Sequence, residues 1–457
     1  MKRIIPIALI ILIMLAILIS VKGVEGANIE AKGDWFYVNG KRFFVNAVGY
    51  SGWRPHQWPG TNKVNLELVD LDFRRIKEAG FNTVRTWAAL DEEELRLAQK
   101  HNLFVIQGVW IDPKLNFSNP QLTSIALRKI KNIVEYSKKY DNIIMYLVMT
   151  EPSQEVVLSA GEDKTLEFFR KAKQIIQSID NKPVSMDSWI PLGFLDHSFW
   201  DVITFNVFMF TPESINRTMG FENYVRWVKK NLAKDKPLFI GETGGFSVSK
   251  KKLNDLGFGG NSEEEQSKGN IDSIQKTIAA GAAGVCTVSW IDTWHYPSNP
   301  NVHNNHPWEW NGILAIKDDT DLKGTPRKVY YDLQRFNRTE VFKKLYSARQ
   351  NKGCSPELFI SLIQGKDSYR VDEFVKIKIK LKDKKGKPAS NQKIDYGFFV
   401  PIGWREEISS GRTDEKGELV ITHPPFGEAG YIIFSAGSIC KEDKKRYGDL
   451  VFIRIYD

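Results

Sequence analysis

The sequence has few of the residues from which several common sites are built. Three cysteines among 457 residues are too few for a disulfide framework, although Cys354 and Cys440 can pair in an oxidising compartment. No Gly-x-Ser-x-Gly motif occurs, which argues against an α/β-hydrolase. The histidines form no His-x-His motif, and the looser spacing of His303 and His306 is not that of a zinc site. We therefore predict neither a metal nor a cofactor.

Charge and glycine patterns argue against two further classes of protein. The chain carries 64 lysines and arginines against 55 acidic residues, but no basic run is interleaved with aromatic residues. This pattern predicts no nucleic-acid partner. The segment 50–56, which follows the first predicted strand, is not a Gly-rich phosphate loop and so argues against a doubly wound nucleotide-binding fold.

The N-terminus indicates export. An apolar run at residues 4–19 follows Lys2 and Arg3 and precedes small residues at positions 23, 26 and 27. This order is typical of a secretory signal, and we assign residues 1–27 to it. The run is shorter than the about 20 residues that span a bilayer, but membrane anchoring through residues 4–19 is the alternative. Both readings predict an extracellular or cell-surface protein.

Residues 28–350 alternate short apolar runs with amphipathic stretches. Eight strand–helix units in about 300 residues are typical of a (β/α)8 barrel. Strands that are covered by helices are buried on both faces, which fits the continuous apolar runs at 104–110 and 143–149. The predicted strands are residues 43–49, 81–87, 103–110, 143–150, 183–189, 202–209, 237–242 and 284–291.

The pattern changes after residue 354, and residues 355–457 predict a small β-sandwich. Apolar residues from Val375 to Leu381 alternate with lysines, as in a half-buried antiparallel strand with a lysine face outward. A run of turn residues at 411–417 precedes another strand-like segment and resembles bacterial immunoglobulin-like repeats.

Two carboxylates end predicted barrel strands. Glu151 follows the fourth strand and Glu242 ends the seventh, each after an apolar run. Catalytic groups of such barrels stand at the C-terminal ends of the strands. Two facing carboxyls about 5 Å apart form the catalytic pair of a retaining glycosidase. Arg85, at the end of the second strand, is the candidate that keeps the nucleophile ionised.

These residues resemble glycoside hydrolase clan A, and within it the family 5, mannanase-like enzymes. The resemblance covers about residues 35–340 and rests on the opening segment 36–50, on Arg85, on Glu151-Pro152, on Gly241-Glu242 and on Trp290. It implies a retaining β-glycosidase acting on a glucan or mannan, with Glu151 as acid/base and Glu242 as nucleophile. It also implies that Trp290 forms the floor of the −1 sugar subsite. Transglycosylation stays open, because the same covalent intermediate can pass to a sugar acceptor.

The chain departs from the family pattern at two positions. Thr150 stands where an Asn usually binds the sugar 2-hydroxyl, and Phe208 stands where a Tyr or His usually lies near the nucleophile. A catalytically weak glycan-binding protein on the same barrel is therefore the alternative function. Further aromatic and imidazole groups that follow strand ends complete the predicted carbohydrate-binding set, namely His56, Trp87, Trp110 and His295.

Overall fold

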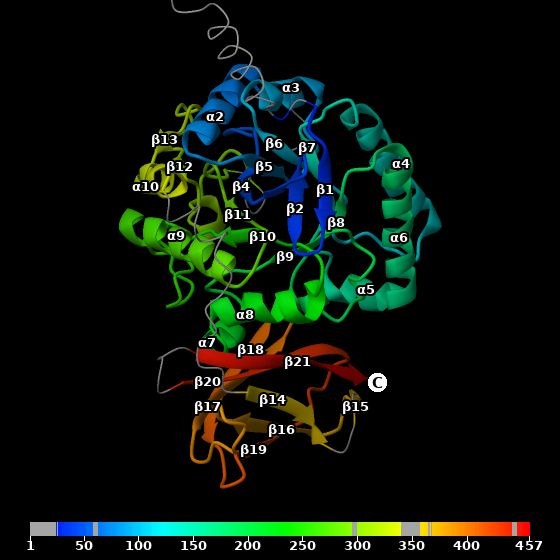
Figure 1. Ribbon diagram of the computed structural model, residues 1–457, viewed down its shortest axis with the longest axis vertical. Coiled ribbons are helices and arrows are strands. Elements are labelled where there is room, and N and C mark those ends of the chain that lie inside the picture. The colour runs from blue at the N-terminus through cyan, green and yellow to red at the C-terminus, as the bar shows by residue number, and fades with distance from the viewer. Residues whose placement is uncertain are drawn as a thin grey trace, which may run out of the picture.

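The computed structural model describes residues 24, 26–57, 63–294, 299–339, 357–363, 366, 368–440 and 446–457. Two bodies follow each other along the chain, a large barrel and a smaller β-sandwich beneath it in Figure 1. The predicted signal or anchor at residues 4–19 lies outside the described residues. Within them, no helix has both the length and the apolar character needed to cross a membrane.

Eight parallel strands close the barrel, which confirms the predicted (β/α)8 fold. Almost every residue of these strands is buried, as expected where helices cover one face and side chains fill the interior. The strands are β4 (Val45–Tyr50), β5 (Thr83–Thr86), β6 (Phe104–Val109), β7 (Ile143–Thr150), β8 (Val184–Ser188), β9 (Ile203–Asn206), β10 (Leu238–Gly244) and β11 (Gly284–Val288).

Helices surround the barrel as an outer layer (Figure 1). Asp91 caps one of them and forms a capping box with Glu94, as the sequence pattern predicts. The helices are α2 (Leu66–Glu78), α3 (Glu92–Lys100), α4 (Pro120–Ser137), α5 (Gln154–Ala160), α6 (Glu162–Ile179), α7 (Glu213–Thr218), α8 (Phe221–Val228), α9 (Glu263–Ala279) and α10 (Lys328–Asn337). A short pair, β12 (Leu314–Ala315) and β13 (Thr325–Pro326), precedes α10.

A small antiparallel sheet precedes the barrel. It consists of β1 (Ile29–Lys32), β2 (Trp35–Val38) and β3 (Lys41–Phe43). Its buried residues Ile29 and Phe36 join an apolar cluster with Val45 and Ala47, which start the first barrel strand. Because parallel strands start at one end of a barrel and finish at the other, this sheet covers the end opposite the strand C-termini.

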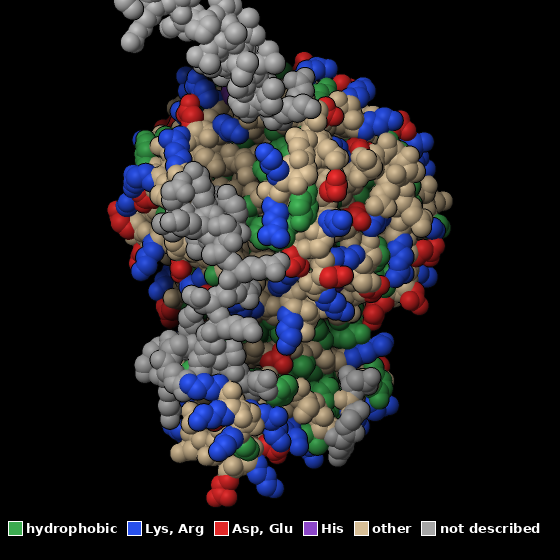
Figure 2. Space-filling view, in the orientation of Figure 1, with side chains coloured by type: hydrophobic (Ala, Val, Ile, Leu, Met, Phe, Trp, Pro, Cys, Tyr) green, Lys and Arg blue, Asp and Glu red, His purple; other side chains and the backbone are tan. Residues whose placement is uncertain are grey.

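The C-terminal residues form two antiparallel-rich sheets around their own apolar core, which confirms the predicted sandwich. Strand β16 alternates buried and more exposed residues, so its lysines point outward as predicted. Basic side chains gather over this domain on the face shown in Figure 2. The strands are β14 (Glu357–Leu362), β15 (Ser368–Arg370), β16 (Val375–Lys382), β17 (Lys393–Val400), β18 (Arg405–Arg412), β19 (Glu418–His423), β20 (Gly430–Ile439) and β21 (Arg446–Tyr456).

The sandwich packs firmly against the barrel at α5, α7 and α8 (Figure 1). Phe399, Ile433 and Leu450 of the sandwich belong to the same buried apolar cluster as the barrel residues. Polar contacts cross the junction as well, for example from Thr218 Oγ1 to Ser435 Oγ at 2.8 Å. The two domains therefore share one continuous core.

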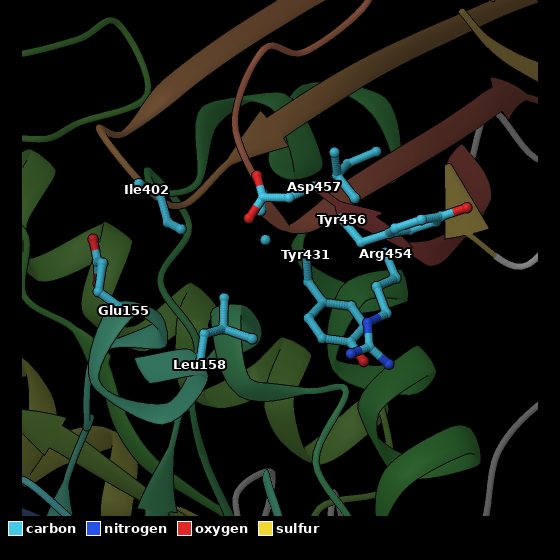
Figure 3. A pocket seen from close by; sticks show the side chains of 10 residues that line it. Glu155, Leu158, Ile402, Tyr431, Arg454, Tyr456 and Asp457 are labelled. Atoms are coloured by element: carbon cyan, nitrogen blue, oxygen red, sulfur yellow. The ribbon is translucent and has the colours of Figure 1, made fainter. Parts of the chain in front are cut away.

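A pocket of about 360 Å³ opens at this junction (Figure 3). Glu155 and Leu158 of α5 line one side, and Ile402, Tyr431 and Arg454 of the sandwich line the other. Neither of the two predicted catalytic carboxylates is among its lining residues.

Candidate active site

The C-terminal ends of four neighbouring barrel strands, β7 to β10, and of β5 across the barrel carry the polar groups of the candidate site. Arg85 lies in β5, Glu151 directly follows β7, Asp187 lies in β8, Asn206 ends β9 and Glu242 lies in β10. Since all these strands run parallel, their C-terminal ends meet at one rim of the barrel.

Arg85 is fully buried and binds two carboxylates with one nitrogen. Its Nη2 lies 3.0 Å from Glu242 Oε1 and also forms an ion pair with Asp187 Oδ2. The guanidinium stacks over the ring of Trp87, with 4.3 Å between Cζ and the ring centroid. Burial opposes the charge, but Asp187 and Glu242 outweigh it and raise the pKa of Arg85. Arg85 is therefore a permanent cation between Asp187 and Glu242.

Glu242 is held by two donors. Its Oε1 accepts a hydrogen bond from Trp87 Nε1 at 2.7 Å in addition to the contact with Arg85. Its side chain is 14% exposed, so solvent or substrate reaches the carboxylate from one side. Burial raises the pKa of Glu242 to about 7, Arg85 opposes this shift, and the charge of Asp187 adds to it. Both donors favour the ionised form, as a nucleophile requires.

Glu151 has a different environment. Its Oε1 accepts a hydrogen bond from the neutral amide of Asn206 at 2.9 Å. Burial, followed by the charge of Glu242, raises the pKa of Glu151 to about 8. The backbone of Glu151 has a φ of 46°, a left-handed conformation that costs a non-glycine residue about 1–2 kcal/mol. Strain of this kind is concentrated at functional sites.

The charges at this rim do not balance. Among the described residues of this rim, Glu151, Asp187 and Glu242 face one cation, Arg85, so these four groups would carry a net charge of −2 when fully ionised. Repulsion in a poorly solvated site is relieved when one carboxyl takes up a proton. Burial raises the pKa of all three carboxyls, but Asp187 and Glu242 are ion-paired with Arg85, whereas Glu151 has no ion pair among the described residues and is the carboxyl best placed to take up the proton. The arrangement thus offers one acid and one ionised nucleophile at a single rim.

Gly241, next to Glu242, is required by packing inside the barrel. A Cβ at this position would lie 2.4 Å from Asp187 Oδ1 and 2.8 Å from Asn206 Oδ1. The structure shows that Gly241 admits the two polar side chains that surround Glu242.

Thr150 and Trp87 contact the charged groups of the candidate site, and their predicted role in substrate binding stays a prediction. Thr150 Oγ1 is 3.5 Å from Arg85 Nη2 and accepts a long hydrogen bond from it. Trp87 contacts both Arg85 and Glu242. Trp110 is 44% exposed directly after β6, at the same end of the barrel, where an indole can contact a sugar.

Other predicted residues have different surroundings. Phe208 is 8% exposed and packs among Phe210 and Trp308 rather than against the carboxylates. His56 binds Asn301 Oδ1 at 2.9 Å on a loop after β4. His295 lies outside the described residues, so its role stays a prediction.

The prediction for Trp290 is wrong. The indole is fully buried and meets Tyr330 of α10 edge-to-face, with 6.1 Å between the ring centroids. Cys286 and Val288, earlier in the same segment, belong to the cluster inside the barrel, whereas Trp290 belongs to the cluster between strands and helices. A side chain that faces the helix layer cannot form the floor of a sugar subsite.

Sequence reasoning missed Asp187 and gave Asn206 no role. Asp187 is fully buried and bonds to Arg85, and the carbonyl of Asp187 accepts the backbone N–H of Glu151 at 2.9 Å. Its signal was present in the sequence, because an acid at the end of an otherwise uncharged strand is the feature that identified Glu151 and Glu242.

Comparison with protein-family models and with curated protein sequences finds no match for this chain. Solved structures do match. A β-glucuronidase of Bacteroides uniformis aligns with a TM-score of 0.54 at 16% identity, covering 94% of this chain and 48% of that one. A GH2 β-galacturonidase from Eisenbergiella tayi aligns with a TM-score of 0.52 at 16% identity, covering 68% and 54%. A Bifidobacterium dentium β-glucuronidase complexed with coumarin-3-O-glucuronide gives 0.54 at 18%, covering 68% and 49%.

At these identities the matches show the fold. This chain spans about half the length of each of these solved structures. The narrower prediction of a family 5, mannanase-like protein gains no support from them. The chain therefore has the closed (β/α)8 barrel fold of these solved structures, followed by a β-sandwich.

Proposed function

We propose that this protein is a retaining β-glycoside hydrolase with Glu242 as nucleophile and Glu151 as acid/base. The observation that carries the proposal is the contrast between the two carboxyls. Glu242 is bound by Arg85 and by the indole N–H of Trp87, whereas Glu151 is bound by the neutral amide of Asn206. Environments that move the pKa values of two carboxyls apart in this way indicate which one is the nucleophile and which one is the acid/base.

The proposed reaction has two displacements. The Glu242 carboxylate attacks the anomeric carbon while the bond to the leaving oxygen breaks and Glu151 gives its proton to that oxygen. The glycosyl group is then an ester of Glu242. Glu151, now ionised, takes a proton from water, the water oxygen attacks the anomeric carbon, and the ester bond to Glu242 breaks. Two inversions restore the β configuration, and a sugar hydroxyl in place of water gives transglycosylation.

The proposed substrate is a β-linked oligosaccharide or polysaccharide of the glucan or mannan type. The test is a panel of aryl β-glucosides, β-mannosides, β-glucuronides and β-galacturonides together with glucans and mannans, with the product anomer followed by NMR. The uronides are included because the structural neighbours are named for them. We expect the β anomer to appear first. An initial α product would overturn the double displacement, and glycan retention without turnover on any substrate would favour the glycan-binding alternative.

The pH profile of kcat/KM is expected to be narrow, with its maximum between the pKa values of about 7 for Glu242 and about 8 for Glu151. Below the first value Glu242 is protonated and cannot attack. Above the second value Glu151 has lost the proton that it gives to the leaving oxygen. Activity should fall about tenfold per pH unit on either side. The profile is measured from initial rates between pH 4 and 10, and circular dichroism is the control for folding. A flat maximum between pH 4 and 6 would contradict the assignment.

Asp187→Asn provides a directional check on the same profile. The charge of Asp187 raises the pKa of Glu242, so its removal should move the acid limb to lower pH. Asparagine keeps the size of the side chain and an oxygen that accepts from Arg85. An acid limb that stays in place or moves to higher pH would show that Asp187 does not act on Glu242.

We also propose that residues 1–27 export the protein, either as a cleaved signal or as an anchor. The support is the basic, apolar and small-residue order of this segment. Fractionation of expressing cells, with N-terminal sequencing of the mature chain, distinguishes the two forms.

A further inference from the structure

One aromatic side chain of the sandwich reaches the rim of the barrel. Trp404 lies at the end of the turn that joins β17 to β18. Its ring stacks on Trp189 of the barrel, with 5.6 Å between the centroids and 19° between the planes. The two residues are 215 positions apart in the sequence, so this contact exists only because the sandwich docks where it does.

Trp189 places this pair beside the proposed acid/base. It directly follows β8, the strand that carries Asp187. Its Nε1 donates a hydrogen bond to the carbonyl of Pro152 at 3.4 Å, and Pro152 is the residue after Glu151. The stacked indoles therefore adjoin the segment that holds Glu151, whereas Trp87 and Arg85 adjoin Glu242.

Trp404 is held in place and remains accessible. Its ring meets Phe399 edge-to-face, with 4.8 Å between the centroids, and Phe399 is fully buried in the core shared by both domains. The Trp404 side chain is still 46% exposed. A half-exposed indole that is held in place can bind a pyranose ring at a small ordering cost for the protein.

We propose that Trp404, together with Trp189, forms the platform of a leaving-group subsite, so that the sandwich contributes directly to the active site. This inference rests on the proposed function. An acid/base residue gives its proton to the leaving oxygen, and the sugar attached to that oxygen must therefore lie on the side of Glu151. The ligand class is the sugar unit beyond the scissile bond of a β-linked oligosaccharide. The same platform holds the acceptor sugar in transglycosylation.

The test compares substrates with and without a sugar on the leaving side. For Trp404→Ala, kcat/KM on a β-linked oligosaccharide should fall about tenfold more than kcat/KM on the β-glycosyl fluoride of the same sugar, whose leaving group is too small to reach the platform. Trp404→Phe should recover part of the loss. Ile408→Ala is the matched control, because Ile408 is an exposed apolar residue of the same hairpin and lies outside the stacked pair. It should change neither substrate.

Equal losses on both substrates would indicate a purely structural role for Trp404 and overturn the inference, and so would no loss on either. Binding separates this inference from the proposed function. In the Glu242→Gln background, Trp404→Ala should weaken oligosaccharide binding about tenfold by calorimetry. If the wild type hydrolyses nothing, the proposed function fails and this binding comparison still decides the role of Trp404. Equal affinities would overturn it.

Discussion

Glu242→Gly is expected to lower kcat/KM for an aryl β-glycoside by about 10⁴- to 10⁶-fold, as for the loss of other covalent nucleophiles. Without the carboxylate, no glycosyl ester forms, and the space left beside Arg85 and Trp87 is open to a small anion. Azide should therefore restore turnover and give an α-glycosyl azide, because one displacement on a β substrate inverts the anomeric carbon.

The azide product is the measurement that defines the role of Glu242. NMR distinguishes the α-azide from the β-azide, and circular dichroism shows whether the variant is folded. If Glu242→Gly keeps more than about 1% of wild-type activity without azide, Glu242 is not the nucleophile, because a covalent route does not survive that loss.

Glu151→Ala is expected to have an effect that depends on the leaving group. For a natural oligosaccharide, kcat should fall by about 10²- to 10⁴-fold, because proton transfer to the leaving oxygen is lost. For a dinitrophenyl glycoside, which needs no proton, the first step should remain fast. The second step should be slow, since water is no longer deprotonated, and a burst of dinitrophenol should precede the steady state. Stopped-flow absorbance measures the burst and the steady-state rate.

Azide rescue and the pH profile of Glu151→Ala provide two further tests of the role of Glu151. Azide needs no base, so it should accelerate the second step and give a β-glycosyl azide, the opposite anomer to that expected for Glu242→Gly. The alkaline limb near pH 8 should also disappear, since it belongs to Glu151. Glu155→Gln is the matched control, because Glu155 is an exposed acid four residues further along, in α5, that lines the pocket in Figure 3. An α-azide from Glu151→Ala, or a loss of the alkaline limb in Glu155→Gln, would refute the assignment.

The barrel was predictable because its signal is local. Buried parallel strands give continuous apolar runs, and the runs at 104–109 and 143–149 coincide with β6 and β7. Once the strands are placed, the topology of a parallel barrel brings their C-terminal ends together, however far apart they are in the sequence. This is why Arg85 and Glu242 were assigned to one site before their 3.0 Å contact was known.

The orientation of individual side chains was not predictable in the same way. Alternation between the two faces of a strand holds only within the strand, and Trp290 lies after β11 has ended. Its indole faces the helix layer, and no periodicity in the neighbouring sequence predicts this orientation. Trp404 was missed for another reason: its partner Trp189 belongs to the other domain, and domain docking leaves no periodic signal in the sequence.

The core shared by Phe399, Ile433 and Leu450 with the barrel has a consequence for how this chain can be altered or recombined. A terminal domain that is joined only by a flexible linker can be deleted or exchanged by gene fusion without destabilising its neighbour. Here removal of the sandwich would expose the apolar residues of α7 and α8 that now pack against it to water. A truncated or chimeric version is therefore expected to stay soluble only if it supplies a substitute for the lost face.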